Sequence, residues 1–192
     1  MKNLSLALAL FSIVLVNAQS TWNFDASHSS VRFAVDHMVI SEVEGKFTSF
    51  EGTVESSKED FSDAKINFII DVNSIDTDNE KRDGHLKNED FFDTPKYPKM
   101  TFESTSVKKI KEGKYKLIGN LTLHGVTKEI TLTMNHGGTI KDPWGNTRAG
   151  LKVTGILNRT DFGLKYNSTL EAGGLMLGEE VELSCKMELV KK

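Results

Sequence analysis

The chain lacks several features that would point directly to a function. Its one cysteine, Cys185, rules out a disulfide within the chain, so the fold must depend on ordinary packing. With 24 Lys and Arg against 27 Asp and Glu, it has no excess of positive charge, which argues against nucleic-acid binding. Beyond Ala18, no apolar run approaches the length of a membrane span.

Motifs of the common enzyme and metal-binding classes are also missing. There is no Gly-x-Ser-x-Gly motif, glycine-rich phosphate loop or dinucleotide fingerprint. The five histidines are not spaced as metal ligands, so we expect neither a metal nor a cofactor. Asp76, Asp78 and Glu80 resemble the start of a calcium loop, but Lys81 and Lys87 stand where an EF-hand needs glycine and glutamate. An enzyme is unsupported rather than excluded, and no catalytic residue is predicted.

The N-terminal stretch is typical of a secretory signal peptide. Lys2 is followed by the apolar run LSLALALFSIVLV, and the small residues of Val16-Asn17-Ala18 fit a cleavage site. The apolar run is too short to span a membrane comfortably, so we expect cleavage rather than a retained anchor. The sequence therefore predicts a periplasmic or secreted protein, with residues 1–18 as signal peptide and 19–192 as one domain.

Period-two alternation of apolar residues predicts a succession of strands in that domain. The clearest case is the last one, where Val181, Leu183 and Cys185 alternate with polar residues. Short turn signals separate the strands, which favours antiparallel neighbours. About eight one-sided strands must bury their apolar faces together, as a sandwich or a closed barrel. We favour the barrel, because the strands are long and glycines such as Gly119 and Gly155 allow the coiling that closure needs.

The interior of such a barrel decides its function. A barrel of this size either is filled by side chains or holds one small ligand. The inward positions are mostly Val, Ile, Leu, Phe and Met, so a cavity among them would favour a lipid tail. Periodicity does not separate these two alternatives. Cys185 falls among the inward positions and is expected to be a buried, inert thiol.

The longest interruption between predicted strands is the stretch 77–102. Thr77 and Glu80 have the spacing of a capping box, which predicts a short helical insertion near residues 78–92. Such a short helix is marginal in water and must be fixed by packing. The apolar anchors available for that packing are Leu86, Phe91 and Phe92. We expect this stretch to lie against the strands as a lid or plug.

A charged pair follows directly on an inward-alternating strand, in the run from Arg159 to Gly163. One interpretation is a salt bridge between Arg159 and Asp161 that pins the end of the strand. The other is that Arg159, with Arg148 or His37, binds an anionic head group at the barrel mouth. The planar guanidinium suits that task because it donates two parallel hydrogen bonds to phosphate or carboxylate oxygens.

Several motifs, taken together, resemble the YceI-like family. They are Trp22-x-Phe-Asp25, His28-Ser29-x-Val-x-Phe33-x-Val-x-His37, Arg82-Asp83-x-His85-Leu86, Asp90-Phe91-Phe92-Asp93, Pro98-x-Met-x-Phe102, Gly119-Asn-Leu121-Thr-Leu-His124-Gly125-Val126-Thr127 and Arg159-x-Asp161-Phe162-Gly163. Each motif is weak alone, but their order and spacing from Trp22 to about Leu189 are specific. One departure is Tyr166, which stands where the family often has a tryptophan.

The resemblance implies an all-β fold, an antiparallel eight-stranded lipocalin-like β-barrel with the helical insertion packed at one end. It also implies an exported carrier that sequesters a long-chain amphiphile, typically a polyisoprenoid of the quinone or prenyl phosphate type and in some cases a fatty-acyl lipid. A tendency to form homodimers is implied as well. The alternatives are a structural or stress-protective barrel with a filled core and, ranked below it, an enzyme acting on such a lipid with His37 or Asp161 as base.

Carried over by position, the resemblance gives two sets of candidate ligand-binding residues. The predicted barrel-wall residues are Phe33, Val35, Phe68, Ile70, Phe102, Leu117, Leu132, Met134, Val153 and Leu183. The predicted head-group residues are His37, Arg148 and Arg159. The charged motif residues have an alternative role in the framework, because a family signature records folding as well as binding.

Overall fold

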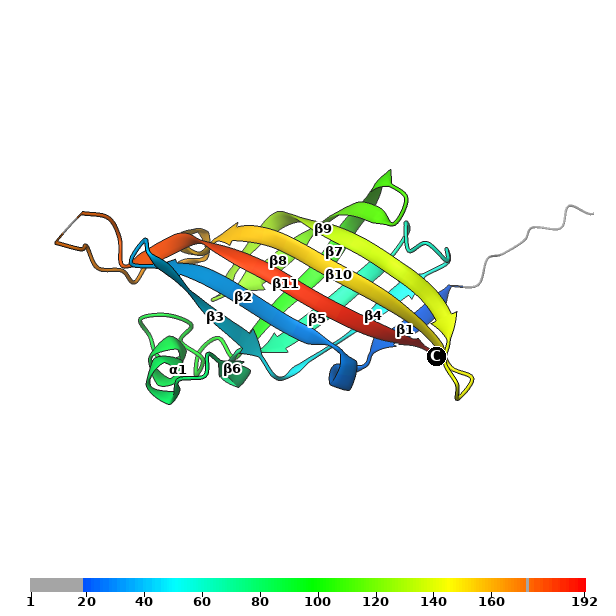
Figure 1. Ribbon diagram of the computed structural model, residues 1–192, viewed down its shortest axis with the longest axis horizontal. Helices are drawn as coiled ribbons and strands as arrows, with labels where there is room; N and C mark the ends of the chain where they lie inside the picture. The colour runs from blue at the N-terminus through cyan, green and yellow to red at the C-terminus, as the bar shows by residue number, and fades with distance from the viewer. Residues whose placement is uncertain (1–18, 172) are drawn as a thin grey trace, which may run out of the picture.

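The computed structural model describes residues 19–171 and 173–192 and shows a barrel of antiparallel strands (Figure 1). The expected signal peptide, residues 1–18, lies outside the described residues. The strands are β1 (Ser20–Phe24), β2 (Ser30–His37), β3 (Ser41–Phe47), β4 (Phe50–Ser56), β5 (Lys65–Asp71), β6 (Ile75–Asp76), β7 (Lys99–Lys111), β8 (Lys114–Leu123), β9 (Val126–Lys141), β10 (Thr147–Asn158) and β11 (Leu177–Lys191). The helical segments are α1 (Glu80–Lys87) and the 3-10 helices Ala26–His28, Val72–Ser74 and Arg159–Phe162.

The sheet closes because β11 pairs with β10 on one side and with both β2 and β1 on the other. β1 and β2 therefore occupy one strand position of the barrel wall and together form one bent strand. β3 and β4 form a second bent strand, since β2 pairs with β3 and β1 with β4. β5 and β6 form a third, because β5 pairs with β4 and β6 with β3. The wall is thus a closed eight-stranded antiparallel barrel, which confirms the predicted fold class.

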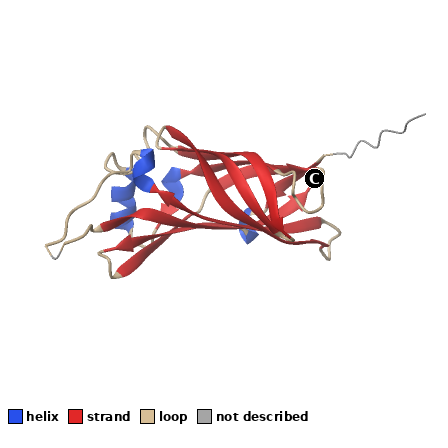
Figure 2. Cartoon of the chain, turned by 90° about the horizontal axis from the view of Figure 1, so that it is seen from above, coloured by secondary structure: helices blue, strands red, loops and turns tan. Residues whose placement is uncertain are grey.

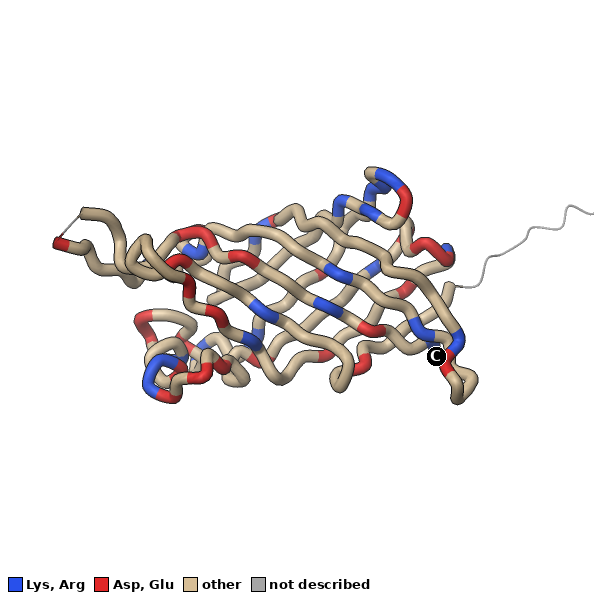
Figure 3. The backbone as a smooth tube through the Cα atoms, viewed as in Figure 1, with Lys and Arg blue, Asp and Glu red and all other residues tan. Residues whose placement is uncertain are grey.

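Alternation along the strands separates the inside of the barrel from the outside. On β8, every second residue from Tyr115 to Leu123 is buried, whereas the residues at the alternate positions are more exposed. Charged residues occupy outward positions of β2, β10 and β11 and appear as coloured bands along these strands in Figure 3. The period-two pattern that predicts the strands therefore also defines which side chains face inward.

One end of the barrel is plugged by side chains. Phe61, in the loop between β4 and β5, is fully buried and packs on Trp22, with ring centroids 5.2 Å apart. Its ring also lies 5.0 Å from that of His136 on β9. The C-terminus and the turn between β9 and β10 lie at this same end (Figure 1). Aromatic packing thus closes this end.

The opposite end is covered by α1 and the loop that follows the 3-10 helix Arg159–Phe162, and most of the helical segments gather there (Figure 2). The pairing of β5 with β7 stops at Asp71 and Lys99, and among the described strands β6 pairs only with β3. The chain between β6 and β7 therefore completes the wall without a full strand. The helical lid expected over this stretch is present.

The start of α1 differs from the expected capping box. Asn79 is the N-cap residue, and its side-chain oxygen accepts from the backbone N–H of Arg82 at 3.1 Å. Thr77 is instead buried, donates its hydroxyl to Asp83 Oδ1 at 2.5 Å and accepts from Arg82 Nε at 2.8 Å. Thr77 therefore fixes the first turn from outside the helix, and the predicted pairing of Thr77 with Glu80 is wrong.

Candidate functional site

An apolar cavity of about 350 Å³ lies inside the barrel. Its lining comes from the long strands of the wall and from α1 with its following loop. Small-molecule sites in proteins span roughly 300–1,000 Å³, so this volume is sufficient for a ligand. The interior is therefore not completely filled by side chains, which is the question that periodicity left open.

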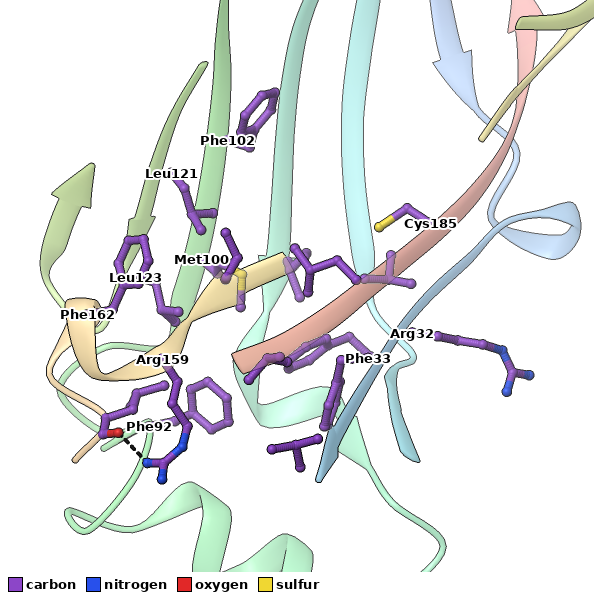
Figure 4. A pocket seen from close by; sticks show the side chains of 18 of the residues that line it. Arg32, Phe33, Phe92, Met100, Phe102, Leu121, Leu123, Arg159, Phe162 and Cys185 are labelled. Atoms are coloured by element: carbon purple, nitrogen blue, oxygen red, sulfur yellow. Dashed lines mark hydrogen bonds between the residues drawn. The ribbon is translucent and has the colours of Figure 1, made fainter. Parts of the chain in front are cut away.

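The cavity wall contains nine of the ten predicted barrel-wall residues. These are Phe33, Val35, Phe68, Ile70, Phe102, Leu117, Leu132, Val153 and Leu183. Met134 is the exception, because it is fully buried opposite Tyr115 and does not line the cavity. Figure 4 shows Phe33, Phe102 and Cys185 projecting toward the same space from different strands. Contact of these residues with a ligand remains a prediction.

Two glycines allow large wall residues to lie against neighbouring strands. A Cβ at Gly155 would come within 2.3 Å of Leu132 Cδ2, and one at Gly119 within 2.5 Å of Phe102 Cζ. Any larger residue at either position would displace the neighbouring side chain. The shape of the cavity therefore depends on these glycines as well as on the apolar residues.

The polar side chains of the lining gather at the end covered by α1. They are His37, Thr77, Arg82, His85, Arg159 and Tyr166. Arg32 borders the cavity but is exposed, and its guanidinium points away from the interior (Figure 4). Within residues 19–171 and 173–192, the lining includes no Asp or Glu. The polar end of the cavity is therefore positively charged.

Arg159 is the most buried charged residue of this group, with 6% of its surface exposed. Its Nε donates to the carbonyl oxygen of Gly178 at 2.8 Å, and Nη1 donates to the carbonyl oxygens of Leu164 and Tyr166. Nη2 is buried without a hydrogen-bond partner among the residues described. The guanidinium thus holds Leu164, Tyr166 and Gly178 together and keeps one nitrogen without an acceptor. Figure 4 draws one of these hydrogen bonds.

The acid expected to pair with Arg159 lies elsewhere. Asp161 accepts from Lys128 Nζ at 2.8 Å on the surface, so the interpretation of a salt bridge between Arg159 and Asp161 is wrong. Burial lowers the pKa of Arg159, an effect that the charge of Glu179 opposes. A guanidinium nonetheless stays protonated in proteins. The cavity therefore holds a buried positive charge.

An aromatic cluster joins the lid to the loop that Arg159 holds. The ring of Tyr166 lies 4.9 Å from His85 on α1 and 4.8 Å from Phe91. His85 and Phe91 are 5.0 Å apart, edge to face. Tyr166 thus provides an aromatic contact between the lid and this loop. Lid and loop close the mouth of the cavity together.

Arg148, the third predicted head-group residue, lies at the opposite end of β10 and does not line the cavity. Its Nη1 donates to Asp25 at 2.8 Å and to Glu188 at 2.6 Å, and its Nε donates to Asp142 at 2.7 Å. His28 joins Asp25 and Glu188 within 4.8 Å, but Nη1 of Arg148 already lies against both carboxylates. Arg148 therefore ties the segment after β1, strand β11 and the turn between β9 and β10 together.

Sequence reasoning missed the contribution of the lid to the cavity. Arg82, His85, Leu86, Phe91 and Phe92 all line it. The sequence indicated that this stretch lies against the strands, and its motifs contain these residues. Nothing in their spacing showed which side chains face inward, because the helix carries no continuous apolar face.

A closed antiparallel barrel with an apolar interior cavity and a helical lid defines a ligand-holding β-barrel. This chain belongs to the YceI-like family, since the YceI-like domain matches residues 22–189. A UPF0312 protein of Staphylococcus aureus strain N315 is 40% identical over 170 residues, covering 88% of this chain and 96% of that protein.

Two solved structures show the same fold. The YCEI protein of Campylobacter jejuni aligns with a TM-score of 0.71 and 32% identity, covering 82% of this chain and 90% of that chain. A polyisoprenoid binding domain from Saccharophagus degradans, implicated in plant cell wall breakdown, aligns with a TM-score of 0.66 and 18% identity, covering 89% and 98%. In the part of this chain that the structure describes, no helix has the length and apolarity to cross a membrane.

Proposed function

We propose that this protein is a non-catalytic carrier that sequesters a long-chain amphiphile of the polyisoprenoid type, with the tail in the barrel cavity. The observation that carries the proposal is the apolar cavity of about 350 Å³, walled by side chains from strands all around the barrel. Removing chain carbon from water supplies about 0.8 kcal/mol per methylene, which is sufficient for useful affinity after the costs of association. The likeness to a polyisoprenoid binding domain supports this ligand class.

The orientation of the ligand follows from the distribution of polar groups. The plugged end is closed by Phe61 and Trp22, so the tail points there. The head group lies at the α1 end, where His37 and Arg159 line the cavity. The head is of the quinone or prenyl phosphate type in this proposal. Arg148 has no part in binding the head group.

Two further elements of the proposal rest on sequence and family. Export to the periplasm or outside the cell is supported by the signal-peptide pattern of residues 1–18, which lie outside the described residues. Homodimer formation is carried over from the family expectation. A structural barrel with a filled core is disfavoured by the cavity, and no specific observation favours an enzyme.

Retention of a prenol by a wall variant tests the carrier function. Purified mature protein is incubated with geranylgeraniol, passed through gel filtration and extracted with solvent for quantification by mass spectrometry. We expect about one molecule per barrel for the wild type. Leu132→Asp, which puts a charge on the cavity wall, loses retention because an unpaired buried carboxylate is strongly unfavourable.

The matched control is Thr131→Asp, the exposed neighbour on β9, which retains the prenol. Circular dichroism confirms that each variant is folded. A folded Leu132→Asp variant with wild-type retention would contradict the placement of the ligand. A wild type that retains no prenol, quinone or fatty acid would contradict the carrier function.

A further inference from the structure

Two arginines from separate segments line the α1 end of the cavity without an ion-pair partner. Arg159 follows β10, and Arg82 lies on the first turn of α1. Among the residues that the structure describes, neither guanidinium has a carboxylate within 4.0 Å. Arg159 is buried and Arg82 is half-buried, and a buried arginine is rare in proteins unless it is paired. Both side chains therefore bring positive charge to the cavity wall without an ion pair of their own.

Arg159 has the geometry of a prepared receptor. Its Nε and Nη1 are fixed by the carbonyl oxygens of Gly178, Leu164 and Tyr166, so the plane of the guanidinium is set before any ligand binds. Nη2 is buried and has no acceptor in the described chain. Carbonyl oxygens satisfy hydrogen bonds but do not neutralise the charge, and Glu179, whose charge acts on Arg159 from a distance, forms no ion pair with it. The unmet requirement is an acceptor that carries negative charge.

Arg82 is the secondary partner because part of its charge is compensated. Its Nε donates to Thr77 Oγ1 at 2.8 Å and its Nη2 to the Thr77 carbonyl oxygen at 2.7 Å. The same Thr77 hydroxyl donates to Asp83 Oδ1 at 2.5 Å, so a carboxylate lies directly behind the hydroxyl that binds Arg82. The packing of His85 on Tyr166, with centroids 4.9 Å apart, joins the segment of Arg82 to the loop held by Arg159.

We infer that the bound lipid carries an anionic head group, a phosphate or a carboxylate, which accepts from Nη2 of Arg159 with Arg82 in support. The barrel therefore selects acidic lipids over neutral alcohols and quinones of the same chain length. This inference rests on the proposed carrier function and specifies its ligand. A neutral head would leave the guanidinium charge unmatched, whereas a phosphate oxygen matches that charge and accepts from Nη2, the one nitrogen that the main-chain carbonyls leave without an acceptor.

Geranylgeranyl phosphate and geranylgeraniol, which share one tail, are the probes that test this inference. Their dissociation constants are measured by calorimetry or competition on the wild-type protein. We expect the phosphate to bind roughly 10–100-fold more tightly, the range of a charge-assisted hydrogen bond. Arg159→Met removes most of this preference, while the affinity for the alcohol changes little. Arg32→Met is the matched control and keeps the preference, because that side chain is exposed and points outward.

Each remaining outcome has a distinct meaning. Equal affinity of the wild type for phosphate and alcohol overturns the inference and leaves the carrier function intact, whereas no binding of either contradicts the carrier function itself. Equal weakening of both ligands in Arg159→Met shows that Arg159 only positions the loop, which also overturns the inference. Inorganic phosphate is the third probe: we expect no binding at the concentrations that saturate geranylgeranyl phosphate, and equal affinity would overturn the inference by indicating a site for free phosphate.

If Arg159→Met does not fold, Arg82→Met and the wild-type ratio keep the inference testable. We expect Arg82→Met to reduce the preference for the phosphate several-fold, less than Arg159→Met, because Asp83 already offsets part of its charge. A preference in Arg82→Met as large as in the wild type contradicts the supporting role of Arg82.

Discussion

Arg148 and Arg159 lie at the two ends of β10 and have different kinds of partner. Arg148 is surrounded by the carboxylates of Asp25, Asp142 and Glu188. Arg159 is more deeply buried, yet it meets only main-chain carbonyls and keeps one nitrogen unpartnered. The same residue type is thus framework where the chain supplies carboxylates for it and, in our proposal, a binding group where the chain supplies none. The two ends of the barrel therefore differ in whether the arginine has carboxylate partners, not in the type of residue.

The largest expected effect is a loss of stability when Arg148, at the plugged end, is replaced. Arg148→Met leaves three carboxylates together without their cation, and we expect the melting temperature to fall by roughly 10 °C. Below that temperature, binding of geranylgeraniol is unchanged because Arg148 does not line the cavity. Scanning calorimetry and a binding titration measure the two effects. An unchanged melting temperature, or lost prenol binding, would show that the two ends are not separate in function.

The rise in melting temperature on ligand binding distinguishes Arg159, at the mouth, from Arg148. At about 100 times its dissociation constant, geranylgeranyl phosphate is expected to raise the melting temperature of the wild type by roughly 5–8 °C. Arg148→Met gains a similar increment from its lower starting point. Arg159→Met gains clearly less at the same ligand concentration, because its affinity for the phosphate is reduced. Identical increments in the two variants would remove the distinction between the arginines.

Acid should weaken the plugged end selectively. The hydrogen bond from Arg148 is the largest cause that lowers the pKa of Asp142 from 3.8 to about 2, and Ser27, Arg148 and His28 lower that of Asp25. A carboxylate with a lowered folded-state pKa stabilises the protein above its unfolded pKa and loses that contribution as pH falls through the folded value. We expect stability against urea to drop between about pH 4 and pH 2.

Asp142→Asn tests the source of this acid sensitivity. The variant is less stable at neutral pH, and its stability changes less between about pH 4 and pH 2, because the titrating carboxylate is gone. Urea unfolding at a series of pH values measures both slopes. Parallel slopes in wild type and variant would mean that other carboxylates dominate.

The smallest effect concerns Cys185, which lines the cavity between the two ends. Burial raises the pKa of its thiol from 9.0 to about 11, so little thiolate exists at pH 8. We expect alkylation by iodoacetamide to be roughly 100-fold slower than in the urea-unfolded chain. Bound geranylgeranyl phosphate slows it further. Reaction at the unfolded rate, or no protection by the ligand, would place the thiol outside the occupied cavity.

The wall of the site could be predicted from the sequence because strand periodicity is local. Leu132 and Met134 nevertheless differ: both face inward on β9, but only Leu132 lines the cavity, since Met134 is buried opposite Tyr115. Alternation defines the face of a strand and carries no information about depth along the barrel. The cavity itself also depends on how side chains from all strands fill the interior. The sequence pattern of a single strand does not predict this.

The roles of the two arginines lay beyond sequence reasoning for a related reason. Arg148 pairs with Asp25 across 123 positions of the chain, whereas the adjacent acid Asp161 turns outward to Lys128 instead of pairing with Arg159. The local signal at Thr77 was overridden in the same way, because its hydroxyl binds Asp83 within the buried lid contact. Partners distant in sequence decide which charges are matched, and only the fold brings them together.

Native mass spectrometry of the protein purified from its own host tests the central claim most directly. The intact mass is recorded first, and any small molecule released on denaturation is then identified. We predict a stoichiometric long-chain isoprenoid with an acidic head group, held in wild type and Arg148→Met alike. Bare protein that stays bare after incubation with prenyl phosphates, quinones and fatty acids would contradict the claim that the cavity carries a lipid.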